Sequence, residues 1–291
     1  MDKLISDLDI RFTLELDLNR LGLQTHSLLI KFRKKPGPEL LSDVFGNKRN
    51  ALCVFMAEGS FDLAVLVASQ DPVKYAYWEN VTTGRLSDYG VWIRPSSISF
   101  LHFGFIPVDS QLIEELNGIL DAKDLDLLKA LNANSRLSYA ELARRTGMNE
   151  DTIRYRLFTL KKSGIIKRFT IAIQKPPHQY ILAFSEDFSY MRHHERDASL
   201  ARNWMMDSDK SMPLLTTFQF VGSLTGSYSN FIMALFGSRK EAMEKVIRRH
   251  KILYRGEELE LKYARITGVL KGLLPFRNLE VRPNYKVVRW E

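Results

Sequence analysis

The sequence contains a single cysteine and no long apolar run, and these two features exclude several classes of protein. With only Cys53 in 291 residues, the chain can form no internal disulfide and no cysteine-rich zinc site. No apolar run approaches the roughly 20 residues that a membrane-spanning helix needs, and the acidic start MDKLISDLD differs from a signal peptide. We therefore expect a cytoplasmic protein with no membrane partner, in which Cys53 is a small buried hydrophobic residue.

Residues arranged for metal or catalytic chemistry are also sparse. His193 and His194 are adjacent, so their side chains point in different directions, and no further ligand at metal-site spacing accompanies them. The glycines from Gly222 to Gly226 are better explained by a hairpin turn than by a phosphate-binding loop. No Ser/His/Asp arrangement can be assigned from spacing. The sequence therefore predicts that the protein is not an enzyme and uses no cofactor or metal.

The chain is basic, and most of its excess charge lies in one short window. The formal net charge is +8. Residues 136–168 hold nine Lys or Arg and three acidic residues, so +6 of the total lies within 33 residues. A basic excess favours polyanionic partners, and its coincidence with a helical pattern favours nucleic acid.

Residues 121–168 contain three short helical patterns separated by tight breaks. The first, over residues 123–132, places its leucines at helical spacing. The second, over residues 139–146, follows Ser138, which is expected to form a capping box with Glu141. This succession is typical of a helix-turn-helix, whose last helix enters the major groove of DNA.

The third helix of this series is the most basic. Gly147 permits the tight turn before it, and Asn149 is expected to cap its first turn. Ile153, Leu157 and Leu160 recur at helical spacing and predict its buried face.

The opposite face of the third helix is expected to contact DNA. Arg154 is the candidate for a base contact, because an arginine can bond guanine O6 and N7 together. Thr152 and Arg156 are expected to hold phosphates. Glu150 and Asp151 favour the positive helix N-terminus and would accept from cytosine amino groups. The full predicted DNA-binding set is Ser138, Arg144, Arg145, Asn149, Glu150, Asp151, Thr152, Arg154, Tyr155, Arg156, Lys161 and Lys162.

The sequence also contains an internal repeat. Arg-Phe-Thr at residues 11–13 recurs at 168–170, and Gly-Ser-Phe at 59–61 is matched by Gly-Ser-Tyr at 226–228. Both copies have the expected order βαββαβ, which predicts an α+β fold with an antiparallel sheet and two helices on one face. Such sheets often pair face to face. The expected elements are strand 25–33, helix 72–83 and strand 89–94 with 97–103 as its continuation, then strand 179–188, helix 239–253 and strand 258–264.

The helical segment resembles the Lrp/AsnC family of helix-turn-helix regulators. The segment GSFD at residues 59–62 is the best local match in the βαββαβ copies, and the second copy has Ser229 where the first has Asp62. The resemblance implies a three-helix winged helix-turn-helix domain and ferredoxin-like, ligand-sensing βαββαβ domains. The matching residues of the helical segment are Asp121, Asp124, Asn134, Ser135, Arg136, Glu141, Leu142, Ala143, Gly147, Thr152, Ile153, Arg156, Leu157, Leu160, Gly164, Ile165 and Ile166.

The order of the parts differs from the usual order in that family, where one sensing domain follows the helix-turn-helix. Here the two sensing domains would flank the helix-turn-helix, as in a tandem duplication that lost its first DNA-binding helices. We expect the two sensing domains to pair within one chain, and strand 8–16 to pair with strand 165–173. The predicted parts are a residual linker strand (1–21), a first sensing domain (22–107), the helix-turn-helix with its linker helix and strand (108–173), a second sensing domain (174–275) and a C-terminal tail (276–291).

These features predict a sequence-specific transcriptional regulator. Its partners would be double-stranded DNA and a second copy of the chain, in a homodimer or larger assembly, because tight specific binding usually uses two half-sites. The resemblance implies an effector similar to an amino acid. The candidate ligand-binding residues lie in the turns of the two copies and are Gly59, Ser60, Asp62, Gly226 and Ser227.

Two other classes of function remain open. The chain would be a DNA-independent adaptor if its one helix-turn-helix were vestigial. It would be an enzyme if it shared the activity of proteins that resemble this family and decarboxylate a haem precursor. For the latter, His250 beside Arg248 and Arg249 is the candidate site.

Overall fold

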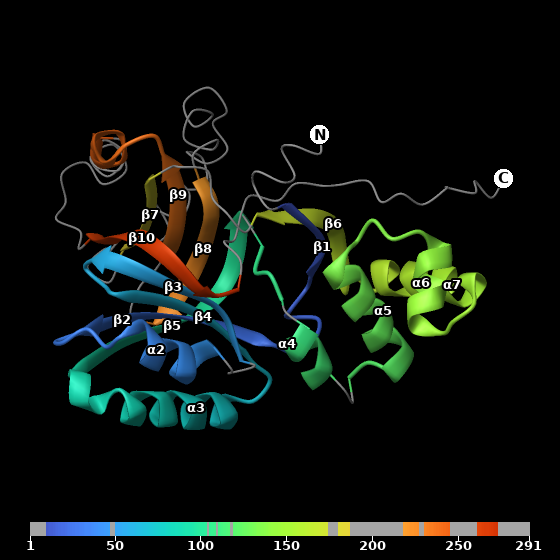
Figure 1. Ribbon diagram of the computed structural model, residues 1–291, viewed down its shortest axis with the longest axis horizontal. Coiled ribbons are helices and arrows are strands. Elements are labelled where there is room, and N and C mark those ends of the chain that lie inside the picture. Colours follow the sequence, from blue (N-terminus) through green and yellow to red (C-terminus); the bar gives the residue numbers. More distant parts are fainter. Residues whose placement is uncertain are drawn as a thin grey trace.

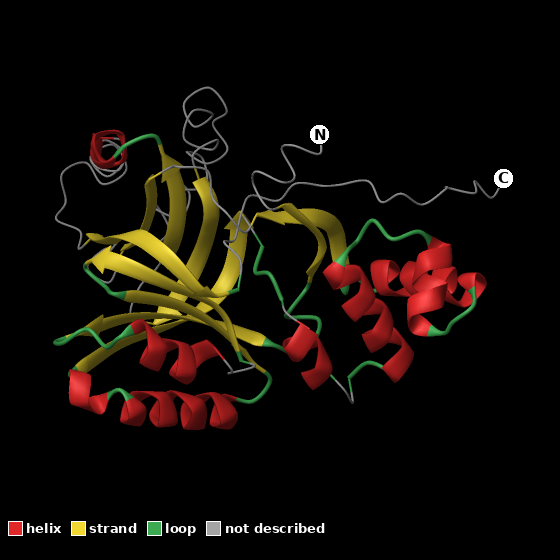
Figure 2. Ribbon diagram, in the orientation of Figure 1, coloured by secondary structure: helices red, strands yellow, loops and turns green. Residues whose placement is uncertain are grey.

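The computed structural model describes residues 10–46, 50–103, 105–108, 110–116, 119–173, 180–186, 218–226, 230–244 and 261–272. Two parts are evident, a β-barrel and a helical domain, with a two-stranded ribbon between them (Figure 1). The same view coloured by secondary structure separates the strands of the barrel from the helices of the second part (Figure 2). The fold is therefore mixed α and β, as the sequence predicts.

The barrel contains eight strands in the closed order β10-β3-β4-β2-β5-β8-β9-β7, and every neighbouring pair is antiparallel. The four barrel strands that come first in the chain lie in the order β3-β4-β2-β5, which is second, third, first, fourth. The last four lie in the same order, β8-β9-β7-β10. The strands are β2 (Gln24–Phe32), β3 (Ala51–Gly59), β4 (Leu63–Ser69), β5 (Val91–Phe103), β7 (Tyr180–Glu186), β8 (Phe218–Gly226), β9 (Asn230–Phe236) and β10 (Leu261–Lys271).

The two sets of four strands are joined through their edges. β5 pairs with β8 at one seam, and β10 pairs with β3 at the other. Backbone hydrogen bonds therefore connect the two sets at both seams, which the expectation of face-to-face packing did not include. Closure also leaves no unpaired edge strand in the barrel.

Two details of the sequence-based strand prediction were wrong. Residues from Gly222 to Gly226 lie within β8 and pair with β5, so this segment is not a hairpin turn. The last strand extends to Lys271, beyond the predicted end at residue 264. It does so because β10 pairs with β3 as well as with β7, so its length depends on both halves of the barrel.

Helices cover the outer face of the first four strands. α2 (Pro38–Leu41) continues into a π-helical turn (Ser42–Gly46), and α3 (Pro72–Arg85) starts at Pro72, which follows the N-cap Asp71. Along β4, Leu63, Val65 and Val67 join the cluster that contains Trp78 of α3, whereas Ala64, Leu66 and Ala68 join a second cluster. This alternation buries both faces of the sheet. A further helical segment covers residues 239–244, and the rest of the predicted helix 239–253 lies outside the described residues.

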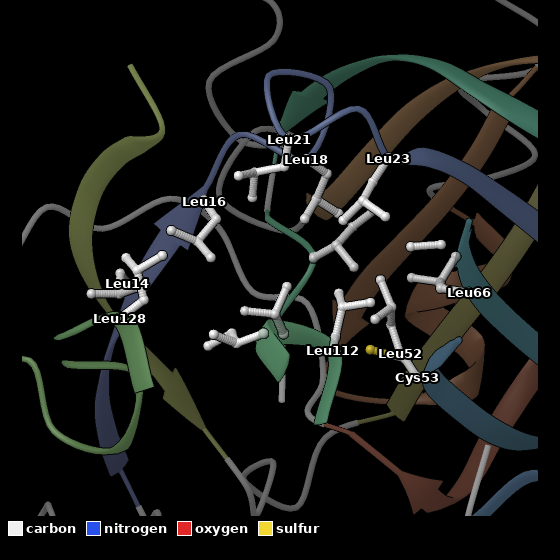
Figure 3. Packing of buried hydrophobic residues seen from close by; sticks show 14 of the residues in the cluster. Leu14, Leu16, Leu18, Leu21, Leu23, Leu52, Cys53, Leu66, Leu112 and Leu128 are labelled. Atoms are coloured by element: carbon white, nitrogen blue, oxygen red, sulfur yellow. The ribbon is translucent and has the colours of Figure 1, made fainter. Parts of the chain in front are cut away.

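One continuous hydrophobic cluster extends from the barrel into the helical domain. It includes Leu52 and Leu66 of the barrel, Leu112 of α4 (Ser110–Glu115) and Leu128 of the next helix. Leucines of the segment between β1 and β2 lie between these groups (Figure 3). Cys53 is fully buried in the same cluster, as predicted from the sequence.

The ribbon next to the helical domain consists of β1 (Ile10–Leu16) and β6 (Ile166–Ile173), which pair antiparallel from Ile10↔Ile173 to Leu16↔Ile166. The predicted pairing of strand 8–16 with strand 165–173 is therefore confirmed for the described residues. The two copies of the Arg-Phe-Thr repeat lie close together in this ribbon, with Thr13 opposite Thr170.

A buried asparagine attaches the ribbon to the helices. Asn132 accepts a hydrogen bond at Oδ1 from the Thr13 hydroxyl (2.8 Å) and donates from Nδ2 to the Val108 carbonyl (3.0 Å). The Arg11 guanidinium donates to the Asn132 carbonyl at 2.8 Å, where the end of a helix leaves carbonyls without helical partners. This network fixes β1 against the helix that contains Asn132.

Among the described helices, none has the length and apolar composition needed to cross a membrane.

Candidate nucleic-acid interface

Three helices form the compact unit predicted from the sequence. α5 spans Ala122–Ala133, α6 spans Tyr139–Thr146 and α7 spans Glu150–Lys162. The limits predicted for the first two helices agree with these to within one residue, and α7 begins directly after its predicted cap Asn149. The residues that form its core are buried and come from all three helices: Leu125, Leu128, Leu131, Leu142, Ile153, Leu157 and Leu160.

Side-chain caps define where each helix starts. Asp121 accepts from the backbone N–H of Asp124, and Asn149 accepts from that of Thr152. The capping box at α6 is present, with the Ser138 N–H donating to Glu141 Oε2 at 2.7 Å. This backbone hydrogen bond, followed by the one from the Ser138 hydroxyl, lowers the pKa of Glu141. The caps of α5 and α6 therefore place the carboxylates of Asp121 and Glu141 at helix N-termini, where the helix dipole favours negative charge.

The turn between α6 and α7 depends on a left-handed residue. Gly147 has φ of +68° and ends α6, and its N–H donates to the Ala143 carbonyl. A residue with a β-carbon pays an energetic cost in this conformation. The prediction that Gly147 permits this turn is confirmed.

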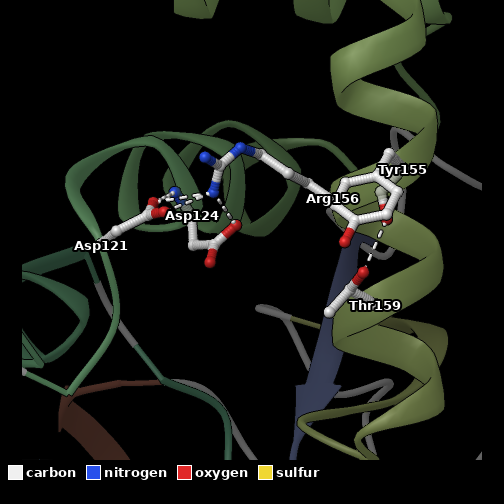
Figure 4. Close-up of polar contacts among 5 residues, drawn as sticks. All are labelled: Asp121, Asp124, Tyr155, Arg156 and Thr159. Carbon is white, nitrogen blue, oxygen red and sulfur yellow. Dashed lines mark hydrogen bonds and ion pairs between the residues drawn. The ribbon is translucent and has the colours of Figure 1, made fainter.

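Arg156 of α7 is turned toward α5. Its Nη1 lies 2.6 Å from Asp121 Oδ2 and 2.8 Å from Asp124 Oδ1 (Figure 4). The pKa of Asp121 is lowered, first by the N–H of Asp124 and then by Arg156, and the pKa of Arg156 is raised by the two carboxylates. These contacts position α7 against α5, a role for Arg156 that was not predicted from the sequence.

Arg154, the residue predicted to contact a base, lies on the flank of α7. Its guanidinium is 3.2 Å from Glu150 Oε2 and 3.2 Å from Asp151 Oδ1, and it lies over the ring of Tyr139 with 4.9 Å to the centroid. Glu150 and Asp151 are therefore partly neutralised by Arg154, so they oppose a nearby phosphate less than isolated acids would. These contacts hold the Arg154 guanidinium close to the first turn of α7.

Four of the predicted basic residues are exposed and form no ion pair with any residue that the structure describes. Arg144 and Arg145 occupy the last turn of α6, and Lys161 and Lys162 occupy the last turn of α7. Lys161 lies over the Phe169 ring at 5.4 Å and Lys162 over the Phe158 ring at 5.8 Å. Unpaired cations on two neighbouring helices suit a phosphate backbone.

The ribbon beside the helices adds less positive charge than the sequence suggests. Arg168 lies 2.9 Å from Glu15, its cross-strand partner, and Lys167 lies 3.6 Å from Asp17. Burial raises the pKa of Glu15, and the nearby Arg168 and Lys167 offset only part of this effect. Within the described residues, Lys167 and Arg168 are therefore paired with acidic residues, unlike Arg144 and Arg145 of α6 and Lys161 and Lys162 of α7.

The structure also exposes a residue that the sequence analysis did not include. Phe158 of α7 is 62% exposed, and Tyr155 is 70% exposed. Asp151, Tyr155, Phe158 and Lys162 follow one another along α7 at spacings of four, three and four residues. Their side chains therefore share one face of the helix, opposite the buried face. The helical period could have identified Phe158, because it places this residue away from the buried face.

Three of the predicted ligand-binding residues, Gly59, Ser60 and Gly226, lie at the seams between the two halves of the barrel. Gly59 is opposite Ala264 of β10, and Ser60 exchanges hydrogen bonds with the backbone of Tyr263. Gly226 occupies a comparable place at the other seam, opposite Ser96 of β5. Ser227 lies outside the described residues.

The carboxylate of Asp62, a predicted ligand-binding residue, is bound by groups of the protein itself. Its carboxylate accepts from the Phe32 N–H (3.0 Å) and lies 3.1 Å from Lys31 Nζ and 3.0 Å from Lys35 Nζ. Burial acts to raise the pKa of Asp62, but the Phe32 N–H and the two lysines together outweigh it, so the pKa is lowered. Lys31 also donates to the Gly59 carbonyl at 2.9 Å, which links this carboxylate to the β3–β10 seam.

A group of polar and aromatic side chains between β2 and α3 was not predicted from the sequence. His26 of β2 stacks on Tyr75 with 4.0 Å between ring centroids, and its Nδ1 lies 3.1 Å from the Ser97 hydroxyl. Burial lowers the pKa of His26. The sequence alone does not reveal this group, because the partners of His26 come from distant parts of the chain.

Among the described residues, no group of three or more His, Cys, Asp or Glu is placed to hold a metal ion. His193, His194 and His250, with its neighbours Arg248 and Arg249, lie outside the described residues. The structure therefore gives no site geometry for these residues.

Comparisons with known proteins agree with this geometry. Residues 120–167 match the family model described as winged helix-turn-helix DNA-binding. An uncharacterised HTH-type transcriptional regulator of Pyrococcus abyssi is 43% identical over 65 residues, which are 22% of this chain and 44% of that protein. Residues 120–167 are thus similar to winged helix-turn-helix DNA-binding domains, and the resemblance to HTH-type transcriptional regulators is confirmed. The chain spans less than half the length of the first regulators that it matches.

The whole chain resembles a different protein in fold. The crystal structure of the siroheme decarboxylase NirDL aligns with 98% of this chain and 82% of its own length, at 14% identity and a TM-score of 0.56. At this identity the likeness describes the fold alone. The structure of Escherichia coli AsnC aligns with 50% of this chain and 91% of its own length, at 21% identity and a TM-score of 0.38.

Proposed function

We propose that the protein is a DNA-binding transcriptional regulator in which α7 enters the major groove. The observation that carries this proposal is the arrangement of α6 and α7, whose exposed sides hold Arg144, Arg145, Lys161 and Lys162 without carboxylate partners among the described residues. Phosphate contacts from flanking cations position a recognition helix, whereas base-edge contacts specify the sequence. The likeness of residues 120–167 to HTH-type regulators supports the same function.

In this proposal the residues of the interface have different roles. Arg154 approaches base edges from the first turns of α7, with Asp151 and Glu150 beside it. Thr152, Asn149 and Ser138 lie at the starts of α6 and α7, where the positive end of the helix dipole would favour a phosphate. Arg156 acts by fixing α7 against α5 through Asp121 and Asp124.

The barrel is proposed to sense a small molecule. Each set of four strands would be one sensing domain, residues 22–107 and 174–275, on either side of the helix-turn-helix. An effector similar to an amino acid would bind near Gly59, Ser60 and Asp62 or near Gly226 and Ser227, because Gly59 and Gly226 lie at the two seams. A change at a seam would reach the helices through the hydrophobic cluster that connects both parts.

The chain is further proposed to assemble as a homodimer or larger. One chain holds one winged helix-turn-helix segment, and high specificity usually needs two half-sites about one helical turn apart. The spacing of half-sites in bound DNA would therefore reveal how two chains are arranged.

The test is binding of the full chain to fragmented genomic DNA at a fixed salt concentration, with sequencing of the recovered fragments. Enrichment of a shared motif supports the proposal. Salt must be fixed because phosphate-driven affinity falls steeply with ionic strength. A folded chain that binds no DNA would contradict it and would leave the adaptor function. A purified chain coloured by a bound tetrapyrrole would instead favour a decarboxylase-like enzyme, for which the whole-chain fold likeness is the motivation.

A further inference from the structure

The outer face of α7 presents two aromatic side chains that no other described part of the chain covers. Asp151, Tyr155, Phe158 and Lys162 form a stripe along α7, and its centre consists of the two aromatic rings. Tyr155 is 70% exposed and Phe158 is 62% exposed. Neither ring belongs to the hydrophobic core of the helical domain, so the fold itself does not require aromatic residues there.

The surroundings of this aromatic stripe indicate which partner would cover it. Lys162 lies over the Phe158 ring, and the exposed Lys161, Arg144 and Arg145 lie on the same helical unit. A partner must therefore be polyanionic at its edges and apolar where it meets the rings. Double-stranded DNA meets both conditions, because the major groove presents the 5-methyl groups of thymine between two phosphate backbones.

We propose, building on the DNA-binding function above, that Tyr155 and Phe158 recognise thymine methyl groups in the major groove. The two residues are three positions apart, about 4.5 Å along the helix axis. This length is comparable to a base-pair step of roughly 3.4 Å, so the two rings fit methyl groups on neighbouring base pairs. Apolar contact with the methyl group distinguishes thymine from the other bases without any hydrogen bond.

The test compares two versions of one DNA duplex. The wild-type chain first selects a duplex from a random-sequence pool, and that duplex is then prepared with either thymine or uracil, which differ only in the methyl group. Affinities of the full chain for both versions are measured by titration at the same salt concentration. We expect the thymine version to bind about fourfold more tightly for each methyl group that is contacted, since burial of one such carbon contributes roughly this factor.

Variants show whether the two rings cause this preference. In Phe158→Ala and Tyr155→Ala, the ratio of thymine to uracil affinity is expected to fall toward one. Tyr77→Ala is the matched control, because Tyr77 on α3 is exposed to the same degree (71%) but lies in the barrel half of the chain. This control is expected to keep the wild-type ratio. Circular dichroism of each variant confirms that the helices remain folded.

Several outcomes would overturn the proposal. If the selected duplex binds wild type equally in both versions, DNA binding stands but methyl recognition fails. If the ratio survives in both ring variants, other residues contact the methyl groups. If the variants change the oligomeric mass and leave the ratio intact, the aromatic stripe is an interface between protein chains. Failure of the folded wild type to select any duplex would overturn the proposed function itself, and methyl recognition with it.

Discussion

Arg156 of α7 and Asp121 at the start of α5 form an ion pair across 35 residues of sequence, with 2.6 Å between Nη1 and Oδ2. The same nitrogen lies 2.8 Å from Asp124. One guanidinium thus bridges the cap and the first turn of α5, and the recognition helix is fixed to the helix behind it. This relationship assigns Arg156 a role inside the domain.

Substitution of Arg156 by Gln is therefore expected to lower the stability of the fold and to leave the number of phosphate contacts with DNA unchanged. The free energy of unfolding should fall by about 1 kcal/mol, a value near the upper end for partly exposed ion pairs. The dependence of DNA affinity on salt should keep its slope. Denaturant unfolding and DNA titrations at several salt concentrations measure the two quantities. Lys123→Gln, which removes an exposed cation on α5, serves as the control. A shallower salt slope at unchanged stability would instead show that Arg156 contacts phosphate.

Arg144 and Arg145 are expected to contribute charge without contributing sequence preference. Replacing either one by Gln should reduce the magnitude of the salt slope by about 0.9 and weaken binding to all duplexes by a similar factor. Titrations of two unrelated duplexes over a range of salt concentrations test this. Arg239→Gln is the matched control, because Arg239 is exposed in the barrel half. A loss restricted to one duplex would identify a base contact.

Asn132 is expected to be important for the attachment of the ribbon to the helices. In Asn132→Ala the Val108 carbonyl loses its buried side-chain donor, whereas the Thr13 hydroxyl keeps its bond to the backbone carbonyl of residue 132. The free energy of unfolding should fall by about 2 kcal/mol, because unsatisfied buried polar groups are costly. Thermal unfolding followed by circular dichroism measures the change. Asn19→Ala, at an exposed position of the linker, should have almost no effect, and an equal effect of both variants would contradict this account.

Gly59 is expected to be required for the seam between β3 and β10. Its φ is +145°, and an added β-carbon would lie 2.5 Å from the Tyr263 carbonyl oxygen. Gly59→Ala should therefore destabilise the protein by about 3 kcal/mol. Gly22→Ala separates the two causes, because Gly22 also has a positive φ (+68°) but has nothing within 4 Å of the added carbon. That control should cost only about 1 kcal/mol, and similar losses at both sites would argue against close packing at the seam.

The stability of the barrel is expected to decrease with acidification through His26. Burial lowers the pKa of His26 below its ordinary value of 6.5. As the pH falls through 6.5, the unfolded chain binds a proton that the folded chain does not, so stability declines until the lower folded pKa is reached. His26→Phe retains a ring against Tyr75 and should flatten this part of the stability profile. An unchanged slope between wild type and variant, measured by denaturant unfolding across the pH range, would exclude His26 as the cause.

The local signals of the helical domain were sufficient to predict it. Ser138 with Glu141, Gly147 and Asn149 define the helix limits through contacts within four residues of sequence, and such signals can be recognised without tertiary information. The pairing of β1 with β6 is non-local, yet it was predicted because the Arg-Phe-Thr repeat related the two strands.

The remaining features depend on contacts between distant segments. The strand assignment of Gly222 to Gly226 follows from pairing with β5, which outweighs the turn preference of its glycines. The partners of Arg156 and of His26 lie 35 and 71 residues away, so the charge pattern alone counted Arg156 as available to DNA. The exposed position of Phe158 was accessible from the helical period, which places this residue away from Ile153, Leu157 and Leu160.

Closure of the barrel within a single chain has an evolutionary consequence. In an assembly of two identical chains, every substitution at a shared seam appears twice and must be tolerated on both sides. Here the seam of β3 with β10 and the seam of β5 with β8 are encoded by different residues. A substitution beside Gly59 therefore leaves the surroundings of Gly226 unchanged. Selection can alter one seam while the other preserves the fold, so the two seams are free to acquire different properties.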